Sequence, residues 1–286
     1  MIDGASPCDQ VLHVQRTYRL DNGQTWTPRN ANHRRIGEMV SIQWGLQNSD
    51  NWVTAELMSR TSPITFKRLL ESYGLRGPIE ATMAMSLGTP EATVGEMVSG
   101  YTTFVNDGVR VDPIMVTQIE DMHGNIVATF APKMTEVLTA DAAHKMLYML
   151  QHVINGGTGG RLRSSFGLQM PLGGKTGTTQ NNSDAWFMGF SPDLVAGCWV
   201  GGEERSIRFN SMAFGQGAAA ALPIFGKFMK KVYADRTLGY LVGIPFQMPQ
   251  GFSPCYDAGG GDDEAVEIFE GESSDTPDSS PPPMDF

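Results

Sequence analysis

A lysine, two threonines and a glycine lie together in the run Lys175-Thr176-Gly177-Thr178, and a second polar cluster, Ser49-Asp50-Asn51, lies far upstream. An ammonium beside hydroxyls attracts an anionic substrate, and the hydroxyls can hydrogen-bond a terminal carboxylate. A glycine in a strand lets a substrate backbone approach closely. On an edge strand, the N–H of Thr178 can also serve an oxyanion hole. These residue types favour acyl transfer on a carboxylate-bearing substrate.

The upstream cluster suits proton transfer and substrate positioning. Ser49 can relay a proton between a leaving amine and a lysine, and Asn51 can hold a substrate amide. A helix that begins at Trp52 with these residues as its N-cap cluster is equally compatible, and Lys175 can also simply face water on an edge strand. The candidate site comprises three catalytic and three substrate-binding residues. The catalytic candidates are Ser49, Asn51 and Lys175, and the substrate-binding candidates are Thr176, Gly177 and Thr178.

The composition indicates a globular protein with an acidic C-terminal end. Of 286 residues, 41% are hydrophobic and 18% charged, which is typical of a chain with a sizeable core. The net charge is −10, but nine acidic residues and no Lys or Arg lie within residues 262–286, which leaves the body near −1. No basic cluster suggests a nucleic-acid partner.

The cysteines and histidines suggest neither a cofactor nor a metal. Cys8, Cys198 and Cys255 are far apart and odd in number, so we expect no disulfide framework. The five histidines have no partners at ligand spacing, so we expect no metal site and no cofactor. The sequence has no 18-residue apolar run and no leader pattern, so we expect the chain, read alone, to be soluble.

The pattern of elements predicts helices, then an antiparallel meander, then a closing helix. This order favours an α+β fold. Beyond residue 250 the composition shifts to Gly, Asp, Glu, Ser and Pro, so we expect a folded domain over residues 1–250 and a disordered tail over 251–286. The expected helices span 37–60 with a break at 48–50, 63–70, 93–104, 139–154 and 218–233. The expected strands span 173–179, 184–190 and 194–200, with a hairpin of 114–121 and 126–130.

Several ordered blocks of sequence accompany the two polar clusters. They are Trp26-Thr27-Pro28-Arg29-Asn30, the run from Leu87 to Thr93 with Glu96-Met97, the run from Asn155 to Gly159, and the run from Gly174 through Asp184-Ala185-Trp186-Phe187 to Gly201. Together with Ser49-Asp50-Asn51 and Lys175-Thr176-Gly177, they resemble the transpeptidase domain of class A penicillin-binding proteins over residues 10–235. The resemblance is specific because many blocks agree in order.

The resemblance implies a sheet of five antiparallel strands with helices on both faces and an active-site cleft beside the sheet. It implies a D,D-transpeptidase that cross-links peptidoglycan stem peptides, with those peptides and β-lactams as ligands that acylate a serine. It also implies a place in the cell envelope, at the outer (periplasmic) face of the cytoplasmic membrane.

One signature of that family is missing. The family combines S-x-x-K, S-D-N and K-T-G, yet no serine in this sequence is followed three positions later by lysine. The resemblance implies that the nucleophile, a glycosyltransferase domain and a membrane anchor all precede Met1, and we expect the given chain by itself to be inactive. Two alternatives stay open: a serine β-lactamase or D,D-carboxypeptidase, and a non-catalytic binding or scaffold module.

Overall fold

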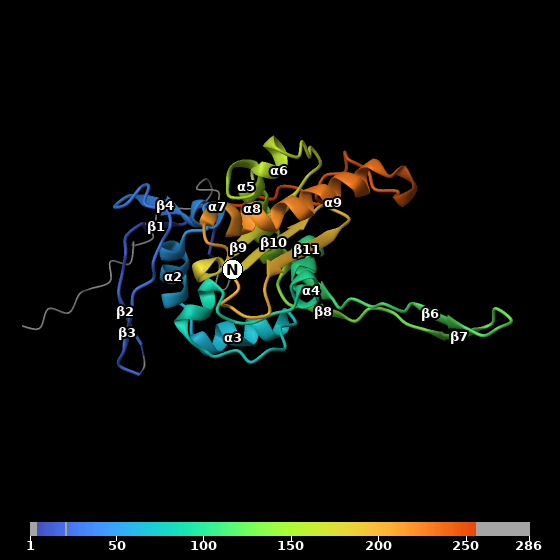
Figure 1. Cartoon of the computed structure of the whole chain (residues 1–286), viewed down its shortest axis with the longest axis horizontal. Coiled ribbons are helices and arrows are strands. Elements are labelled where there is room, and N and C mark those ends of the chain that lie inside the picture. Colours follow the sequence, from blue (N-terminus) through green and yellow to red (C-terminus); the bar gives the residue numbers. More distant parts are fainter. Residues whose placement is uncertain (1–4, 21, 256–286) are drawn as a thin grey trace, which may run out of the picture. The chain divides into compact units, whose positions relative to one another are not determined.

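The computed structural model describes residues 5–20 and 22–255. Most of the predicted tail, residues 256–286, therefore lies outside the described residues. The centre of the fold is an antiparallel sheet of three strands in the order β11-β10-β9 (Figure 1). These strands are β9 (Gly173–Thr178), β10 (Asp184–Phe190) and β11 (Val195–Gly201).

Alternation along β10 gives the sheet two apolar faces. Ala185 and Phe187 join one core cluster, whereas Phe190 joins another. Strand residues alternate between faces, so these odd and even positions point in opposite directions. In the β9–β10 register, Lys175 lies opposite Met188 and Thr178 opposite Ala185. The Lys175–Thr178 motif therefore lies on an edge strand, and pairing with the largely buried strand β10 fixes its position.

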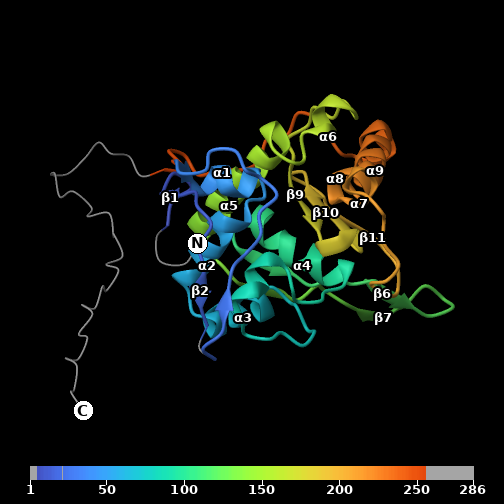
Figure 2. The same ribbon diagram turned by 60° about the vertical axis from the view of Figure 1, so that its left-hand side comes forward.

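Helices cover both faces of this sheet. Against the Phe187 face lie α8 (Gly217–Ala220) and α9 (Leu222–Ala234), which contributes Phe225 and Met229 to the core. Against the Phe190 face lie α4 (Val94–Val105) and α5 (Ala140–Gly156) (Figure 2). The expected fold class, an α+β fold with an antiparallel sheet and helices on both faces, is confirmed.

Of the five strands that the resemblance implies, the described residues supply three in the central sheet. Only β9, β10 and β11 pair in the central sheet there, and the other strands pair two by two in separate small sheets. β10 and β11 form seven paired positions, whereas β1 (Gln10–Leu12) and β4 (Met39–Ser41) form three. Residues 5–20 and 22–41 instead form short pairs beside the helices.

Side-chain caps mark the starts of α2 (Asn51–Ser59) and α4. The expected break at 48–50 separates α1 (Ile42–Gln47) from α2, and Thr93 and Glu96 form a capping box on α4. The expected final helix is divided at Ala221 into α8 and α9. The remaining elements are α3 (Pro63–Ser72), α6 (Arg161–Ser164), α7 (Met212–Gly215), η2 (Met83–Leu87), η3 (Gln180–Asn182), η4 (Arg236–Leu238), β2 (Tyr18–Arg19), β3 (Thr25–Trp26), β5 (Val109–Val111) and β8 (Met134–Glu136).

The predicted hairpin is present as β6 (Gln118–Glu120) and β7 (Ile126–Thr129). Asp121 closes its turn by accepting hydrogen bonds from the N–H groups of His123 and Asn125. Figure 1 shows this ribbon extending away from α4 and the sheet. All of its β6 residues and most of its β7 residues are exposed.

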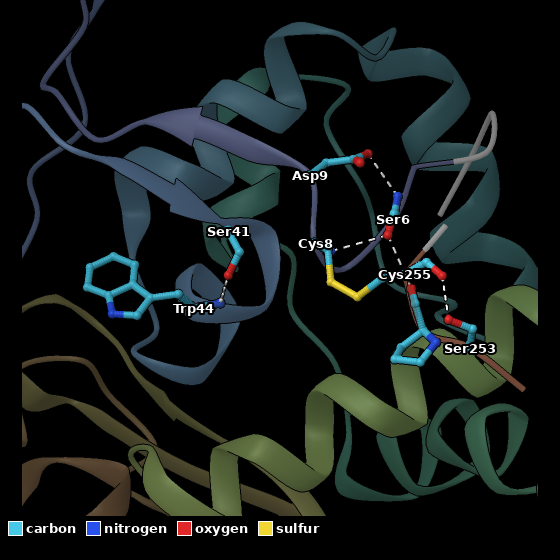
Figure 3. The surroundings of a disulfide bond; sticks show 8 residues. Ser6, Cys8, Asp9, Ser41, Trp44, Ser253 and Cys255 are labelled. Carbon is cyan, nitrogen blue, oxygen red and sulfur yellow. Dashed lines mark hydrogen bonds between the residues drawn. A yellow bond between two sulfur atoms is a disulfide. The ribbon is translucent and has the colours of Figure 1, made fainter. Parts of the chain in front are cut away.

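A disulfide joins the N-terminal and C-terminal ends of the described fold, contrary to the expectation from cysteine spacing. Cys8 and Cys255 are 247 residues apart in sequence, yet their Cα atoms lie 5.4 Å apart. Figure 3 shows Ser6 linking the same two segments: it donates to the carbonyl of Pro254 at 3.1 Å. Linear spacing carries no information about such a long-range pair, which only the fold brings together. Residues 251–255, predicted as the start of the tail, are therefore attached to the folded unit.

Among the described residues, no helix combines the length and apolar character needed to cross a bilayer.

Candidate active site

The fold brings the two polar clusters together. Lys175 Nζ donates a hydrogen bond to Ser49 Oγ at 2.7 Å, although 126 residues separate them in sequence. Lys175 Nζ also donates to the carbonyl of Thr176 at 2.9 Å. Ser49 lies between α1 and α2, and Lys175 lies on β9. A hydroxyl and an amine at this distance can exchange a proton directly.

Ser49 adopts an unusual backbone conformation. Its φ is +55°, in the left-handed region that residues other than glycine seldom occupy. The N–H of Ser49 bonds to Leu46 at the end of α1, while Asp50 accepts hydrogen bonds from Trp52 N and Val53 N at the start of α2. The sharp reversal between two helices thus presents Ser49 as an exposed residue directly before a buried one.

Lys175 is only partly exposed, and loss of hydration around its ammonium lowers its pKa to about 8. Near neutral pH, a useful fraction of such a lysine is uncharged and able to accept a proton. The remainder is an ammonium that attracts an anion. The environment of Lys175 therefore supports both proton transfer and carboxylate binding.

The next motif residue, Thr176, is tied to the end of α5. Its hydroxyl donates to Thr158 Oγ1 at 2.8 Å, and Thr158 N donates to the carbonyl of Gln47 in α1 at 3.2 Å. Thr158 therefore connects the sheet edge to the helix that precedes Ser49. Because the Thr176 proton is used internally, Thr158 is the hydroxyl of this pair that can donate to a ligand.

Gly177 and Thr178 hold the start of α8 against the sheet. Thr178 Oγ1 accepts a hydrogen bond from Gly217 N at 2.9 Å, which leaves the exposed hydroxyl its own proton to donate. A Cβ on Gly177 would approach Trp186 Cβ at 3.0 Å. On the side of the strand where a Gly177 Cβ would lie, the close neighbour is therefore the protein's own residue Trp186.

Asn51 lies near this cluster but its side chain is partly committed. Asn51 Nδ2 donates to the carbonyl of Arg29 at 2.8 Å. Within the described residues, its Oδ1 accepts no hydrogen bond and can receive one from a ligand N–H. The structure therefore brings Ser49 and Lys175 into direct contact and anchors Asn51 beside them.

Sequence reasoning assigned no role to Thr158 and Gly217. Thr158 belonged to a block that carried the resemblance, but its role as partner of Thr176 depends on how α5 ends beside β9. Gly217 lies directly before the predicted helix of 218–233 and belongs to no motif. A glycine at that boundary was the signal that could have marked its close contact.

We expect the substitution Gly217→Ala to loosen β9 from the start of α8. The added Cβ would lie 2.5 Å from the carbonyl oxygen of Gly177 and would also meet that of Trp186. Both are backbone atoms in paired strands and cannot yield easily, so unfolding should become easier by about 1–3 kcal/mol. Urea unfolding of the variant measures this. Gly243→Ala, where nothing lies within 4 Å, is the control and should change little.

This chain is similar in sequence to known proteins. Residues 8–197, more than half of the chain, match the family model for the penicillin binding protein transpeptidase domain. Penicillin-binding protein 1A of Aquifex aeolicus is 31% identical over 218 residues, which cover 75% of this chain and 28% of that protein. The corresponding protein of Neisseria gonorrhoeae is 28% identical, with 80% and 28% covered. The chain thus spans less than a third of the length of these relatives.

Solved structures share the fold. Penicillin-Binding Protein 1A from Haemophilus influenzae superposes with a TM-score of 0.73 at 22% identity, over 82% of this chain and 40% of that chain. Penicillin-binding protein A from M. tuberculosis, in an imipenem acyl-enzyme complex, superposes with a TM-score of 0.61 at 18% identity, over 79% and 56%. The match of the family model over residues 8–197 shows that this chain belongs to the penicillin-binding protein transpeptidase domain family.

Proposed function

We propose that this chain supplies the Ser-x-Asn and Lys-Thr-Gly parts of a serine-type D,D-transpeptidase active site. The substrate is the D-alanyl-D-alanine end of a peptidoglycan stem peptide, and β-lactams occupy the same site. The observation that carries the proposal is the 2.7 Å hydrogen bond between Lys175 Nζ and Ser49 Oγ, formed across 126 residues of sequence.

Each residue then has a chemical task. Ser49 and Lys175 form a proton relay: Ser49 gives a proton to the leaving amine and recovers it from Lys175. The Thr178 hydroxyl donates to the terminal carboxylate of the substrate, and the Lys175 charge strengthens that attraction. Asn51 Oδ1 accepts from a substrate amide.

Gly177 and Thr176 shape the strand edge along which the stem peptide lies. Gly177 adds no side chain between that edge and the substrate, and Thr176 keeps Thr158 in place through its 2.8 Å hydrogen bond. Acylation itself requires a serine nucleophile.

The disulfide supports a location outside the cytoplasm. Disulfides such as Cys8–Cys255 form and persist in oxidising compartments, including the bacterial periplasm. This agrees with a place in the cell envelope, at the outer face of the cytoplasmic membrane, where stem peptides are cross-linked.

No observation favours the alternatives. A serine β-lactamase needs a base that deacylates the enzyme, and the sequence has no Glu-x-x-Leu-Asn block after Ser49. A D,D-carboxypeptidase uses the same groups and differs in passing the acyl group to water. A scaffold role predicts that no form of the protein reacts with penicillin.

We expect the protein expressed from the complete gene to form a covalent adduct with fluorescent penicillin, and the polypeptide of residues 1–286 alone to form none. The reason is that acylation needs the serine of an S-x-x-K motif, which these residues lack. Labelling is read on a denaturing gel. Label on the isolated polypeptide would disprove the assignment of roles, and no label on the complete protein would favour the scaffold alternative. Release of D-alanine with transfer to an added amine separates transpeptidase from carboxypeptidase.

A further inference from the structure

The residue between Ser49 and Asn51 is a fully buried carboxylate with four hydrogen-bond donors around it. Asp50 has no exposed side-chain surface. Its Oδ1 accepts from Trp52 N and Val53 N at 3.0 and 3.1 Å. Its Oδ2 is 2.9 Å from His13 Nε2 and accepts from Asn30 Nδ2 at 2.7 Å. Two of these donors cap α2, but the other two come from distant segments.

His13 is a buried side chain held in a single orientation. It directly follows β1, is fully buried, and lies between the rings of Trp44 and Trp52 at centroid distances of 5.2 and 5.0 Å. With Asp50 Oδ2 as the acceptor, His13 Nε2 is the donor of their hydrogen bond, and Asn30 Nδ2 lies 3.3 Å from the same Nε2. Nδ1 has no hydrogen-bond partner among the described residues. A buried polar atom left unpaired is costly, so His13 is held in this position at an energetic cost.

The segment of residues 28–30 also binds the turn between α1 and α2. Asn30 Oδ1 accepts from Asn51 N at 3.1 Å, so Asn30 binds both Asp50 and Asn51. The carbonyl of Arg29 accepts from Asn51 Nδ2, and the carbonyl of Pro28 accepts from Trp52 Nε1 at 3.1 Å. Every residue from 50 to 52 is therefore held by this segment.

We propose that His13 and Asn30, acting through Asp50, form a positioning network that keeps Ser49 Oγ opposite Lys175 Nζ. The inference rests on the proposed function for its meaning in catalysis. Neither His13 nor Asn30 touches Ser49 or Lys175 through its side chain in any hydrogen bond of the described residues, so both act through the turn rather than on a substrate.

The unusual conformation of Ser49 explains why such a network is needed. A residue other than glycine at φ +55° tends to relax unless its neighbours fix it. Helix capping alone uses only Asp50 Oδ1. The Oδ2 contacts with His13 and Asn30 fix the direction from which the chain enters α2, and hence where Ser49 points.

The test uses the protein expressed from the complete gene, with the variants His13→Leu and His13→Gln. Leucine keeps an apolar side chain between the tryptophans but removes the donor, whereas the glutamine amide can still donate to Asp50. We expect His13→Leu to slow the chemical step of penicillin acylation by about 10- to 100-fold, because a small displacement of a reacting group has effects of this size. The affinity of initial penicillin binding should be unchanged, and His13→Gln should restore the rate to within about threefold.

His144→Leu is the matched control. His144 is also buried and its Nε2 lies 2.9 Å from Asp107 Oδ1, but it lies on α5 and contacts none of the proposed site residues. It should lower the melting temperature without changing the acylation rate of the folded fraction. Equal rates for His13→Leu and the parent protein would overturn the inference.

Crystal structures of the parent and His13→Leu decide the same point without any activity. The inference requires Ser49 to leave hydrogen-bond distance of Lys175 in the variant, and an unchanged pair would overturn it. If the parent protein takes up no penicillin, the proposed function fails, while this structural comparison still tests the network.

Discussion

Replacing Lys175 with methionine should abolish acylation and, at the same time, make the fold more stable. General acid–base groups contribute about 10²- to 10⁴-fold to rate, and Lys175 also supplies the charge that attracts the substrate carboxylate, so a loss of at least about 10³-fold is expected. Acylation by fluorescent penicillin in the protein expressed from the complete gene measures the loss. In the parent protein, the rate should fall as the pH rises through about 8, because Lys175 then loses the proton that it passes to Ser49 and the charge that attracts the carboxylate.

The gain in stability follows from the same pKa. Folding lowers the pKa of Lys175 from 10.5 to about 8, so below pH 8 the native protein holds an ammonium that has lost part of its hydration. The resulting loss in the free energy of unfolding has its full size below pH 8. It shrinks as the pH rises from about 8 to 10.5, because the native state then binds fewer protons than the unfolded state. Methionine removes the penalty, which for a partly exposed group is on the order of 1 kcal/mol.

Urea unfolding at pH 7 and pH 9.5 tests the sign of this effect. The advantage of Lys175→Met should be larger at pH 7. Lys145→Met is the control: Lys145 lies on α5 in a 2.8 Å ion pair with Asp141, so its loss should not stabilise the fold or slow acylation. A Lys175→Met protein that is less stable than its parent at pH 7 would show that the ammonium is well accommodated.

The second large effect concerns the Cys8–Cys255 disulfide. Replacing both cysteines with alanine should lower the free energy of unfolding by about 2–5 kcal/mol, since cross-links that close long loops restrict the unfolded chain most. The sequence separation of 247 residues puts this bond at the upper end of that range. Such a change is comparable with a large part of the net stability of a domain, which is about 5–15 kcal/mol.

Thermal unfolding with and without a reducing agent measures the effect. The parent protein should lose stability on reduction, whereas the Cys8→Ala, Cys255→Ala protein should not respond. Cys198→Ala provides the control, because Cys198 is unpaired on β11. If the parent protein melts at the same temperature in both conditions, the disulfide joins a segment that unfolds before the rest of the domain.

The two parts of the candidate site could be located from the sequence because each is a short run of neighbouring residues. Lys175 to Thr178 form a strand beside a turn, and Ser49 to Asn51 form a helix break, and both are confirmed as elements. Their 2.7 Å contact was predictable only through the resemblance, since no property of either segment specifies the other. The catalytic roles of these residues remain predictions.

The parts that could not be predicted depend on long-range packing. His13 had no partner at any spacing that suggests chemistry, and its contact with Asp50 exists because β1 pairs with β4 just before α1. The disulfide was not predicted for the same reason: its two cysteines meet only through long-range packing. The number of strands in the central sheet also depends on pairing between distant segments. The resemblance implies five strands in that sheet, and the described residues contribute three of them.

The disulfide has a topological consequence apart from stability. Residues 8–255 form a covalently closed ring, in which the backbone is one arc and the Cys8–Cys255 bond completes the circle. A ring opened at one peptide bond is still one molecule. A protease that cuts the exposed β6–β7 ribbon would separate Ser49 from Lys175 along the backbone, yet both would stay on one covalent chain through the sulfur atoms. The two halves of the site would therefore keep a high effective concentration after such a cut.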